Sequence, residues 1–421
     1  MGNDSYSEAM LGDSPRSRVV IVGAGHGGAN AAAFLRQKGF GGEVILIGEE
    51  PVMPYQRPPL SKAYIADHMS VEDLYLKPTQ FYRDQGIELR LGTRVAEVNP
   101  EGKFVSFSDG TTLEYDVLIL ATGAAPRSLD VPGSDLTGIQ ELRTIADAGR
   151  LRDLIPSSGH LVVVGGGYIG LEVAAVCQTN GVRVTVIERE DRLLARVASV
   201  ELSKVLTAYH QERGTNILTS DSVVGFAGGA DGAVRSVILS DGTEIACGGV
   251  LTGIGAVPCD ALACGAGLHC DNGIVVDEQS RTSDRWIFAI GDVTRRPLPN
   301  RTDLFRMESI PSAVEQAGQA VAAIMGGPQP KPEVPWFWSD QFNLKLKMAG
   351  LVHEGEEVIA RNSLEGFKIA FFHVRGENVV AVETINSPGE FMAGKRFIEK
   401  NARVDLTKLA DSSVPLQGVL V

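Results

Sequence analysis

The sequence predicts an α/β protein in which two similar strand–turn–helix modules precede a smaller C-terminal α+β domain. Three observations predict this fold class. A β-branched apolar run, a glycine cluster and an Ala-rich segment follow one another twice, at 19–33 and at 161–177. The chain has 421 residues, which is too long for one ordinary hydrophobic core. A Pro-rich link at 326–335 leads to segments with alternating apolar residues, 366–374 and 378–385, which predict an antiparallel sheet.

Composition and charge exclude several classes of function. The chain is 44% hydrophobic, yet no apolar run approaches the roughly 20 residues that span a bilayer, so no membrane segment is expected. The net charge of −13 argues against nucleic acid as a partner, because phosphate binding needs a basic face. The first 15 residues are polar and lack the pattern of a signal peptide. We therefore expect a disordered tail at 1–16 and a cytoplasmic protein.

The cysteines do not form a recognisable framework. There are five, an odd number, which favours a reducing compartment over a set of disulfides. Cys259, Cys264 and Cys270 lie in a segment that is typical of a short helix and strand, and we expect them to be small packing residues. Iron–sulfur spacing is missing, so no metal site is predicted.

The two glycine clusters carry the first chemical signal. Both fit the pattern G-x-G-x-x-G, with its three glycines at Gly23, Gly25 and Gly28 and at Gly165, Gly167 and Gly170. The first glycine makes a tight turn after a strand, the second lets the backbone approach a pyrophosphate, and the third lets the helix pack on the strand. Such turns also occur without a ligand, so the surrounding sequence must decide.

An acidic residue completes each pattern. Apolar segments at 43–50 and 182–190 predict a second strand for each module, ending near Glu49 and Glu188. An acid about 20 positions past the last glycine can accept hydrogen bonds from an adenosine ribose. Two complete patterns therefore predict two Rossmann-like dinucleotide-binding domains. A redox enzyme needs two dinucleotides when it passes a hydride from nicotinamide to flavin.

Further segments fit the same interpretation. Residues 112–127 predict a strand that leads into a turn of small residues, where Thr122 and Gly123 could approach a cofactor, and 248–258 repeats this pattern. Residues 285–294 predict a buried strand that ends in Gly291–Asp292. That acid could bind a flavin ribityl hydroxyl, or the pair could simply form a turn.

The segments VVIVGAGHGG, LILATGAAPR, VVVGGGYIGLEVAA and IFAIGDVT resemble the pyridine-nucleotide disulfide reductase superfamily. Within it, 56–66, 306–317 and 335–350 are similar to the FAD-containing, NADH-dependent ferredoxin reductases that supply oxygenases. Residues 29–60 contain no cysteine, so the superfamily's redox disulfide is absent. The resemblance implies a glutathione-reductase-like arrangement: a split FAD-binding domain, a NAD-binding domain and a C-terminal domain, at 17–125 with 259–328, at 126–258 and at 331–421.

The resemblance also implies the site residues. FAD is expected to contact Gly23, Gly25, Gly27, Gly28, Glu49, Arg57, Lys62, Val95, Thr122, Gly123, Arg143, Asp292 and Ile310. NADH is expected to contact Gly165, Gly167, Tyr168, Ile169, Gly170, Glu188, Arg196 and Gly253, with Glu172 and Glu308 near the nicotinamide. Lys62, Glu172 and Trp338 are the catalytic candidates, with Lys62 and Glu172 expected to pair near flavin N5 and Trp338 to lie beside the flavin. The alternatives are a solvated lysine, a surface acid and a core aromatic residue.

The implied activity is hydride transfer from NADH to FAD, followed by single-electron transfer to a [2Fe-2S] ferredoxin that serves a monooxygenase or an aromatic-ring dioxygenase. The alternatives are a rubredoxin or small-molecule reductase and a flavoprotein of the apoptosis-inducing-factor type. For a ferredoxin to dock on this acidic chain, a local basic patch is needed. Segment 394–408 provides Lys395, Arg396, Lys400, Arg403 and Lys408 against two acidic residues, although a solvated helix would look the same.

Overall fold

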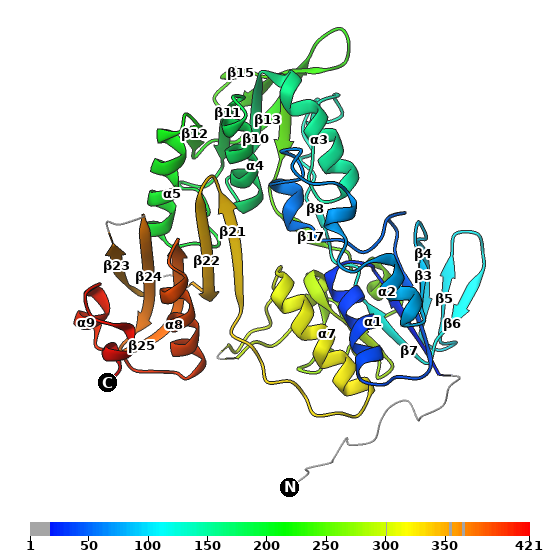
Figure 1. Ribbon diagram of the computed structural model, residues 1–421. Coiled ribbons are helices and arrows are strands. Elements are labelled where there is room, and N and C mark those ends of the chain that lie inside the picture. Colours follow the sequence, from blue (N-terminus) through cyan, green and yellow to red (C-terminus); the bar gives the residue numbers. More distant parts are fainter. Residues whose placement is uncertain (1–16, 300, 353–355, 364–366) are drawn as a thin grey trace. The chain divides into compact units, whose positions relative to one another are not determined.

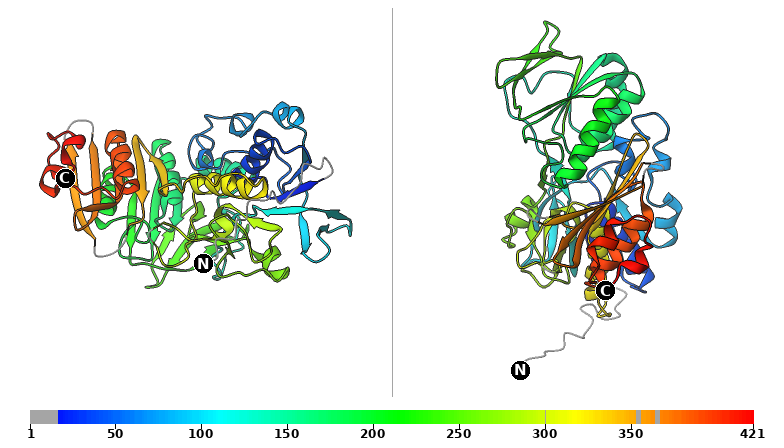
Figure 2. Two further views of the ribbon diagram at one scale, coloured as in Figure 1. Left: turned by 90° about the horizontal axis from the view of Figure 1, so that it is seen from below. Right: turned by 90° about the vertical axis from the view of Figure 1, so that its left-hand side faces the viewer.

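The computed structural model describes residues 17–299, 301–352, 356–363 and 367–421. The predicted tail at 1–16 lies outside these residues. The chain forms two compact units (Figures 1 and 2), of which the first comprises 17–56, Glu72–Ala125 and Val257–Glu333, and the second Arg57–Val71, Pro126–Ala256 and Val334–Val421. These two units are compact bodies and not the three domains expected from the sequence, whose boundaries stay a prediction.

The first unit is built on a parallel sheet with strand order β19-β7-β1-β2-β3. Its strands are nearly continuous apolar runs, as expected for a sheet that is covered on both faces. One face packs against α1 (His26–Gln37) and α7 (Ile310–Ile324), which lie side by side in Figures 1 and 2. The strands are β1 (Arg18–Val22), β2 (Glu43–Ile47), β3 (Ile87–Arg90), β7 (Val117–Leu120) and β19 (Ile287–Ala289).

The other face of this sheet is covered by an antiparallel sheet and a short helix. They are β4 (Val95–Asn99), β5 (Phe104–Phe107), β6 (Thr112–Glu114) and α6 (Ala261–Gly265). The remaining elements of the first unit are η2 (Glu72–Leu74), α2 (Thr79–Asp84), β18 (Ile274–Val275), η3 (Gly291–Val293) and β20 (Thr294–Arg295). Strands β8 (Ala124–Pro126) and β17 (Ala256–Pro258) lie where the chain passes from one unit to the other.

The second unit repeats the parallel arrangement with strand order β12-β11-β10-β16-β9. An antiparallel sheet packs on one of its faces through apolar side chains. The parallel strands are β9 (Ile139–Gln140), β10 (His160–Val164), β11 (Arg183–Glu188), β12 (Asn216–Thr219) and β16 (Gly249–Thr252). The other elements are η1 (Pro58–Ser61), α3 (Ile145–Ser158), α4 (Tyr168–Thr179), α5 (Val200–Glu212), β13 (Val223–Gly228), β14 (Val234–Leu239) and β15 (Glu244–Ala246).

The C-terminal part of the second unit is an antiparallel sheet with strand order β21-β22-β25-β24-β23. One face forms an apolar core with α8 (Pro388–Glu399) and α9 (Leu406–Ala410). The other face carries buried polar side chains, among them Ser339 and Glu383. The strands are β21 (Trp336–Gln341), β22 (Leu344–Gly350), β23 (Glu357–Ser363), β24 (Lys368–Arg375) and β25 (Asn378–Ile385), and η4 (Leu416–Val419) follows α9.

The predicted α/β fold class with a C-terminal α+β domain is confirmed by these sheets. One strand is shorter than predicted. β19 ends at Ala289 instead of continuing to Gly291–Asp292, because Gly291 has a φ of +81° and begins the η3 turn. No helix in the described part of the chain is long and apolar enough to cross a membrane.

Candidate dinucleotide sites and a buried ion pair

The first glycine turn joins β1 to α1 in the first unit. Gly23 has a φ of +114°, and a Cβ atom there would lie 2.1 Å from the carbonyl oxygen of Ala121. A Cβ atom on Gly28 would lie 1.9 Å from the carbonyl oxygen of Gly23. At Gly25, in contrast, nothing lies within 4 Å of an added Cβ atom. The first and last glycines are therefore required by packing, and the middle one borders open space.

The second glycine turn, between β10 and α4, has the same geometry. Gly165 has a φ of +104°, and an added Cβ atom would lie 2.5 Å from the carbonyl oxygen of Gly253. On Gly170 it would lie 2.6 Å from the carbonyl oxygen of Gly165, and on Gly167 it would meet nothing within 4 Å. Both turns thus leave room at the glycine that would let a backbone approach a ligand.

Both helices also begin in a way that suits an anion. α1 and α4 have glycine as their N-cap residue, at Gly25 and Gly167, so the N-cap residue has no side chain that could accept from the N–H groups of the first turn. α3 and α5 instead begin with capping hydroxyls from Thr144 and Ser199. A helix N-terminus without a side-chain cap, with the positive end of the helix dipole, suits a pyrophosphate. The residues present therefore fit one dinucleotide at each turn.

The two predicted ribose acids lie in different surroundings. Glu188 folds back on its glycine turn, where its carboxylate accepts the N–H groups of Gly166 at 2.7 Å and of Glu190 at 2.9 Å. The side chain of Glu49 is 68% exposed and lies 3.3 Å from the guanidinium of Arg94. Glu188 is therefore held in place by the backbone, and Glu49 faces solvent.

The other FAD candidates of the first unit lie at the ends of its strands. The Thr122 hydroxyl donates to the carbonyl of Cys259 at 2.7 Å, and Gly123 follows with a φ of +71°. Asp292 lies in η3, directly after Gly291. The N–H group of Gly291 donates to the Gln316 side chain at 2.8 Å. Gln316 is fully buried, and the sequence analysis missed its anchoring role.

The remaining first-unit candidates occupy helices and a strand. Gly27 lies in α1, where an added Cβ atom would be 3.4 Å from Ile290, and Val95 is buried at the start of β4. Ile310 is the first residue of α7. Glu308 lies just before it, partly exposed, 2.5 Å from the guanidinium of Arg306.

The predicted ion pair between Lys62 and Glu172 is present in the second unit. The Lys62 ammonium lies 2.8 Å from Oε1 of Glu172, and the two side chains are 18% and 5% exposed. Lys62 also donates to the carbonyl of Pro58 at 3.3 Å. The pair is therefore inside the protein, so the solvated lysine and the surface acid are the wrong descriptions of these two residues. Their contact with a flavin or a nicotinamide stays a prediction.

Two serine hydroxyls complete the surroundings of Glu172. Ser61 donates to Oε2 and Ser339 donates to Oε1 at 2.6 Å. The carboxylate thus accepts from an ammonium and from two hydroxyls, which satisfies a buried acid. Neither serine was predicted, and the sequence of β21 gives no alternating signal, because its polar residues Ser339, Asp340 and Gln341 follow one another.

Predicted flavin and nicotinamide residues meet near this ion pair. Arg57 donates to the carbonyl of Arg143. A small cavity of about 40 Å³ is lined by Arg57, Leu60, Ser61, Leu142, Arg143 and Ile169. Arg57 and Arg143 were expected near the flavin and Ile169 near NADH, so the second unit brings these three residues together at one cavity.

The aromatic candidates lie on opposite faces of β21. The ring of Tyr168 packs edge-on against Phe337 at 5.0 Å, and its buried hydroxyl has no hydrogen-bond partner among the described residues. Burial, with Glu383 and Glu172 nearby, raises the pKa of Tyr168. Trp338 lies 5.7 Å from Trp336, which also contacts Phe391 of α8. The place of Trp338 beside a flavin stays a prediction.

Two further NADH candidates lie at the carboxyl ends of the parallel strands. The Gly253 N–H donates to the carbonyl of Val164 at 2.7 Å. The exposed guanidinium of Arg196 lies 3.4 Å from the position of a Cβ atom on Gly255. This edge is where ligands bind in parallel α/β sheets.

The cysteines follow the sequence interpretation in part. Cys270 packs against the apolar core of the first unit, as predicted, but Cys264 is exposed, so the packing interpretation is wrong for that residue. Burial and the neighbouring Cys264 thiol raise the pKa of Cys270 to about 12. Asp260, Cys264 and Cys270 place their ligand atoms within 4.8 Å of one another, a grouping that the sequence analysis did not anticipate.

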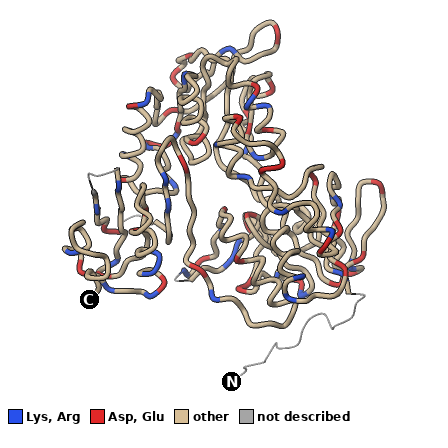
Figure 3. The backbone as a smooth tube through the Cα atoms, viewed as in Figure 1, with Lys and Arg blue, Asp and Glu red and all other residues tan. Residues whose placement is uncertain are grey.

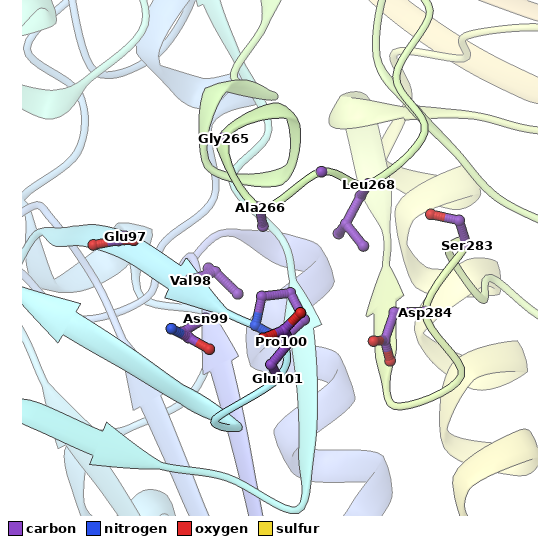
Figure 4. A pocket seen from close by; sticks show the side chains of 11 residues that line it. Glu97, Val98, Asn99, Pro100, Glu101, Gly265, Ala266, Leu268, Ser283 and Asp284 are labelled. Carbon is purple, nitrogen blue, oxygen red and sulfur yellow. The ribbon is translucent and has the colours of Figure 1, made fainter.

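A larger cavity lies elsewhere in the first unit (Figure 4). It has a volume of about 460 Å³ and is lined by Glu97, Val98, Asn99, Pro100, Glu101, Gly265, Ala266, Gly267, Leu268, Ser283 and Asp284. None of the predicted cofactor residues lines it. Its size alone therefore does not mark it as the redox site.

Comparison with known proteins decides the family. The model of the pyridine nucleotide-disulphide oxidoreductases matches residues 17–317, and the model of the reductase C-terminal domain matches 336–420. The chain belongs to the pyridine nucleotide-disulphide oxidoreductase family. The expected resemblance is thereby confirmed, as is the glutathione-reductase-like α/β fold class.

Individual members of this family match over nearly the whole chain. The probable ferredoxin reductase CtmF of Castellaniella defragrans is 45% identical over 96% of this chain and 99% of its own. Putidaredoxin reductase CamA of Pseudomonas putida is 41% identical over 96% of both chains. The solved covalent complex of putidaredoxin reductase with putidaredoxin superposes with a TM-score of 0.93 at 40% identity, over 96% of this chain and 98% of the other. The predicted enzyme class, an electron-transfer oxidoreductase that uses FAD and NADH, is confirmed.

Proposed function

We propose that this oxidoreductase takes a hydride from NADH onto FAD and passes single electrons to a [2Fe-2S] ferredoxin that serves a monooxygenase or an aromatic-ring dioxygenase. The observation that carries the proposal is the pair of equivalent glycine turns, each with open space at its second glycine. The names of the relatives, ferredoxin reductase and putidaredoxin reductase, support the acceptor. We also propose a cytoplasmic location.

When bound, FAD converts the two-electron donation of NADH into single-electron steps. The chain contributes binding and orientation. The turns at Gly23 and Gly165 would hold the two pyrophosphates, and Glu49 and Glu188 would accept from the adenosine riboses. The Lys62–Glu172 pair, 2.8 Å apart and buried, orders the side chains where the two rings would stack.

An acceptor comparison tests the proposal. Purified enzyme is given NADH and, in parallel, [2Fe-2S] ferredoxins, rubredoxin or ascorbate radical, with ferricyanide as the non-specific acceptor. We expect a higher kcat/KM with at least one [2Fe-2S] ferredoxin than with rubredoxin or ascorbate radical. Equal or better turnover with rubredoxin would instead support the rubredoxin reductase alternative.

The docking surface for the ferredoxin is proposed on the C-terminal segment, which carries basic residues among acidic ones (Figure 3). The residues of the predicted patch differ in the contacts that they already make within the chain. Arg403 pairs with Glu377, Lys408 lies 3.5 Å from Asp405, and Lys395 lies 5.3 Å from the ring of Trp336. Arg396 and Lys400 are exposed and have the most freedom to meet an acidic partner.

Charge reversal tests this surface. Arg396→Glu with Lys400→Glu should raise the KM for ferredoxin by roughly tenfold and leave NADH-to-ferricyanide turnover unchanged, because rim charges act on association. The wild-type reaction should also weaken as salt shortens the Debye length below about 8 Å. Lys408→Glu is the matched control, since Lys408 already faces an acid. A loss of both activities, or of neither, would place the dock elsewhere.

A further inference from the structure

A row of buried polar side chains connects α5 to the Lys62–Glu172 pair within the second unit. Nε2 of His210 lies 2.9 Å from Oε1 of Gln341, and Nε2 of Gln341 lies 3.2 Å from the Ser339 hydroxyl. That hydroxyl lies 2.6 Å from Oε1 of Glu172. His210, Gln341 and Ser339 are all 0% exposed. The row therefore runs wholly through the interior and ends on the carboxylate.

The hydrogen bonds of this row have one direction. A carboxylate oxygen only accepts, so Ser339 donates its proton to Glu172 and accepts from the amide nitrogen of Gln341. The amide oxygen of Gln341 then faces His210, whose Nε2 must carry the proton. Burial lowers the pKa of His210, which favours a neutral ring with a single N–H group. Every donor in the row thus points toward Glu172.

This arrangement follows from the strand and fixes the carboxylate. Side chains two positions apart share a face of a strand, so β21 presents Ser339 and Gln341 together. Oε1 of Glu172 accepts from both Ser339 and Lys62. The position of Ser339 therefore sets the orientation of the Glu172 carboxylate toward the Lys62 ammonium. Hydrogen bonds that point the same way polarise and strengthen one another.

We propose that Ser339, Gln341 and His210 are positioning residues for flavin reduction by NADH. They hold the carboxylate of Glu172 in the orientation that keeps Lys62 in place at the site where hydride transfer is proposed. Ser339 acts directly on Glu172, and Gln341 and His210 act through Ser339. The inference rests on the proposed function, because it assigns these residues to the NADH half of that reaction and not to the transfer of electrons to the acceptor.

Stopped-flow reduction of the bound flavin by NADH tests the row. Ser339→Ala should lower the rate constant at saturating NADH by about tenfold, as expected for one hydrogen bond to a charged group. Gln341→Leu and His210→Gln should cost progressively less, since they lie further from Glu172. The NADH concentration that gives half of the maximal rate constant should change little. Ser203→Ala is the matched control, because Ser203 is 1% exposed and its hydroxyl donates to the Leu193 carbonyl at 2.7 Å, outside the row.

Coupling to Lys62 separates positioning from a general loss of stability. In a Lys62→Ala background, Ser339→Ala should cost almost nothing more in rate, because its effect passes through the ion pair. Ser339→Thr keeps the hydroxyl and should retain most of the rate, even though the added methyl group lowers the midpoint of urea unfolding. If Ser339→Ala does not fold, Gln341→Leu and Ser339→Thr provide the same comparison.

The outcomes distinguish this inference from the proposed function. Equal rates for Ser339→Ala and Ser203→Ala, or fully additive losses with Lys62→Ala, would overturn the positioning role while wild-type reduction by NADH stands. If NADH does not reduce the wild-type flavin, the proposed function fails and the positioning role fails with it.

Discussion

The two glycine turns have nearly the same backbone, but they differ at two equivalent positions. One module has a side chain where the other has a glycine. Val22 pairs with Ile47 and Val164 with Ile187, so Gly48 in the first module occupies the place of Glu188 in the second. Between the glycines, Ala24 in the first module corresponds to Gly166 in the second. A Cβ atom on Gly48 would lie 2.8 Å from that of Ala24.

In the second module the glycine lies within the turn, and the side chain lies at the end of the second strand. Gly166 has no side chain, and a Cβ atom there would lie 2.5 Å from Cδ2 of Leu193 and 3.1 Å from Oε2 of Glu188. The methyl group of Ala24 and the carboxylate of Glu188 therefore occupy equivalent room, and each requires a glycine opposite. This difference explains why the acid is bound by backbone N–H groups in the second module and moves one residue further, to exposed Glu49, in the first.

The largest expected effect comes from breaking the turns themselves. Gly23→Ala should lower the free energy of unfolding by about 3 kcal/mol or more, because it forces a positive φ and a close contact with the Ala121 carbonyl. Gly25→Ala should leave unfolding nearly unchanged and lower FAD content, since its methyl group enters only open space. Urea unfolding and the FAD-to-protein ratio measure the two effects. A Gly25→Ala enzyme that is unstable, or that keeps wild-type FAD affinity, would contradict this division.

The second largest effect should appear only in the second module. Glu172 lies two residues after Gly170, and the equivalent residue after Gly28 is Asn30, which donates to the carbonyl of His26 in its own helix. Lys62→Ala removes the partner of Glu172 and should slow flavin reduction by NADH ten- to hundredfold, about 1.5–3 kcal/mol. Stopped-flow absorbance gives the rate.

Asn30→Ala is the matched control for that variant, because it removes a side-chain hydrogen bond at the equivalent helical position. Its flavin reduction rate should equal that of the wild type. An unchanged rate for Lys62→Ala would mean that the buried pair only stabilises the fold.

A smaller effect should follow from closing the space opposite Glu188. The wild type should prefer NADH over NADPH, because Glu188 accepts from a 2′-hydroxyl and repels a 2′-phosphate. Arg189 does not offset this, since its guanidinium pairs with Glu190 at 2.8 Å. Gly166→Ala should displace Glu188 and raise the KM for NADH several-fold, roughly 1 kcal/mol in binding. The ratio of kcat/KM values for the two nucleotides is the measurement.

Ala24→Gly provides the reciprocal experiment in the first module. It empties the equivalent space and should change neither the nucleotide preference nor the FAD content. Comparable kcat/KM values for NADH and NADPH in the wild type would show that Glu188 does not select the nucleotide.

The smallest expected effect is a pH dependence of stability, which arises from His210 in the second unit. Burial is the main cause that lowers the pKa of His210. The hydrogen bond with Gln341 opposes this effect, and the nearby charge of Arg213 adds to it. The unfolded chain therefore binds a proton first as the pH falls through about 6.5, and the stability that the neutral ring contributes is lost toward the folded pKa. The stability difference between wild type and His210→Gln should shrink between pH 7.5 and pH 5.5 in urea unfolding. A difference that is constant with pH would contradict the lowered pKa.

The sequence predicted the parts of the fold that depend on local patterns. The two glycine turns, the acids after the second strands and the alternating C-terminal strands each follow from spacing within a short segment. The resemblance added the ion pair, whose members are far apart in the chain but lie within family motifs. Residues outside such motifs, such as Gln316, which anchors Gly291, were missed because only the folded chain brings them together.

The exposed Cys264 and the early end of β19 show a second limit. Cys264 lies inside the short helix α6, whose buried residue is Ala263, and a helix of five residues is too short for an apolar pattern to fix its buried face. The end of β19 depends on a single residue, whereas apolar patterns locate element ends only to within a few positions. The hydrogen-bond row behind Glu172 could not be predicted from β21, whose polar residues are consecutive, because the row depends on tertiary contacts with Glu172 and with α5.

The turn between β21 and β22 consists of Phe342 and Asn343, with Gln341 paired to Leu344. Phe342 has a φ of +53°, and Asn343 accepts from the Tyr209 hydroxyl. If the pairing with β22 absorbs a single inserted residue here, every side chain of β21 moves to the other face, and Asp340 takes the place where Ser339 meets Glu172. Length changes should therefore be tolerated in the Pro-rich link at 326–335 and eliminated by selection at this hairpin, which makes the link the better place to graft or fuse another C-terminal module.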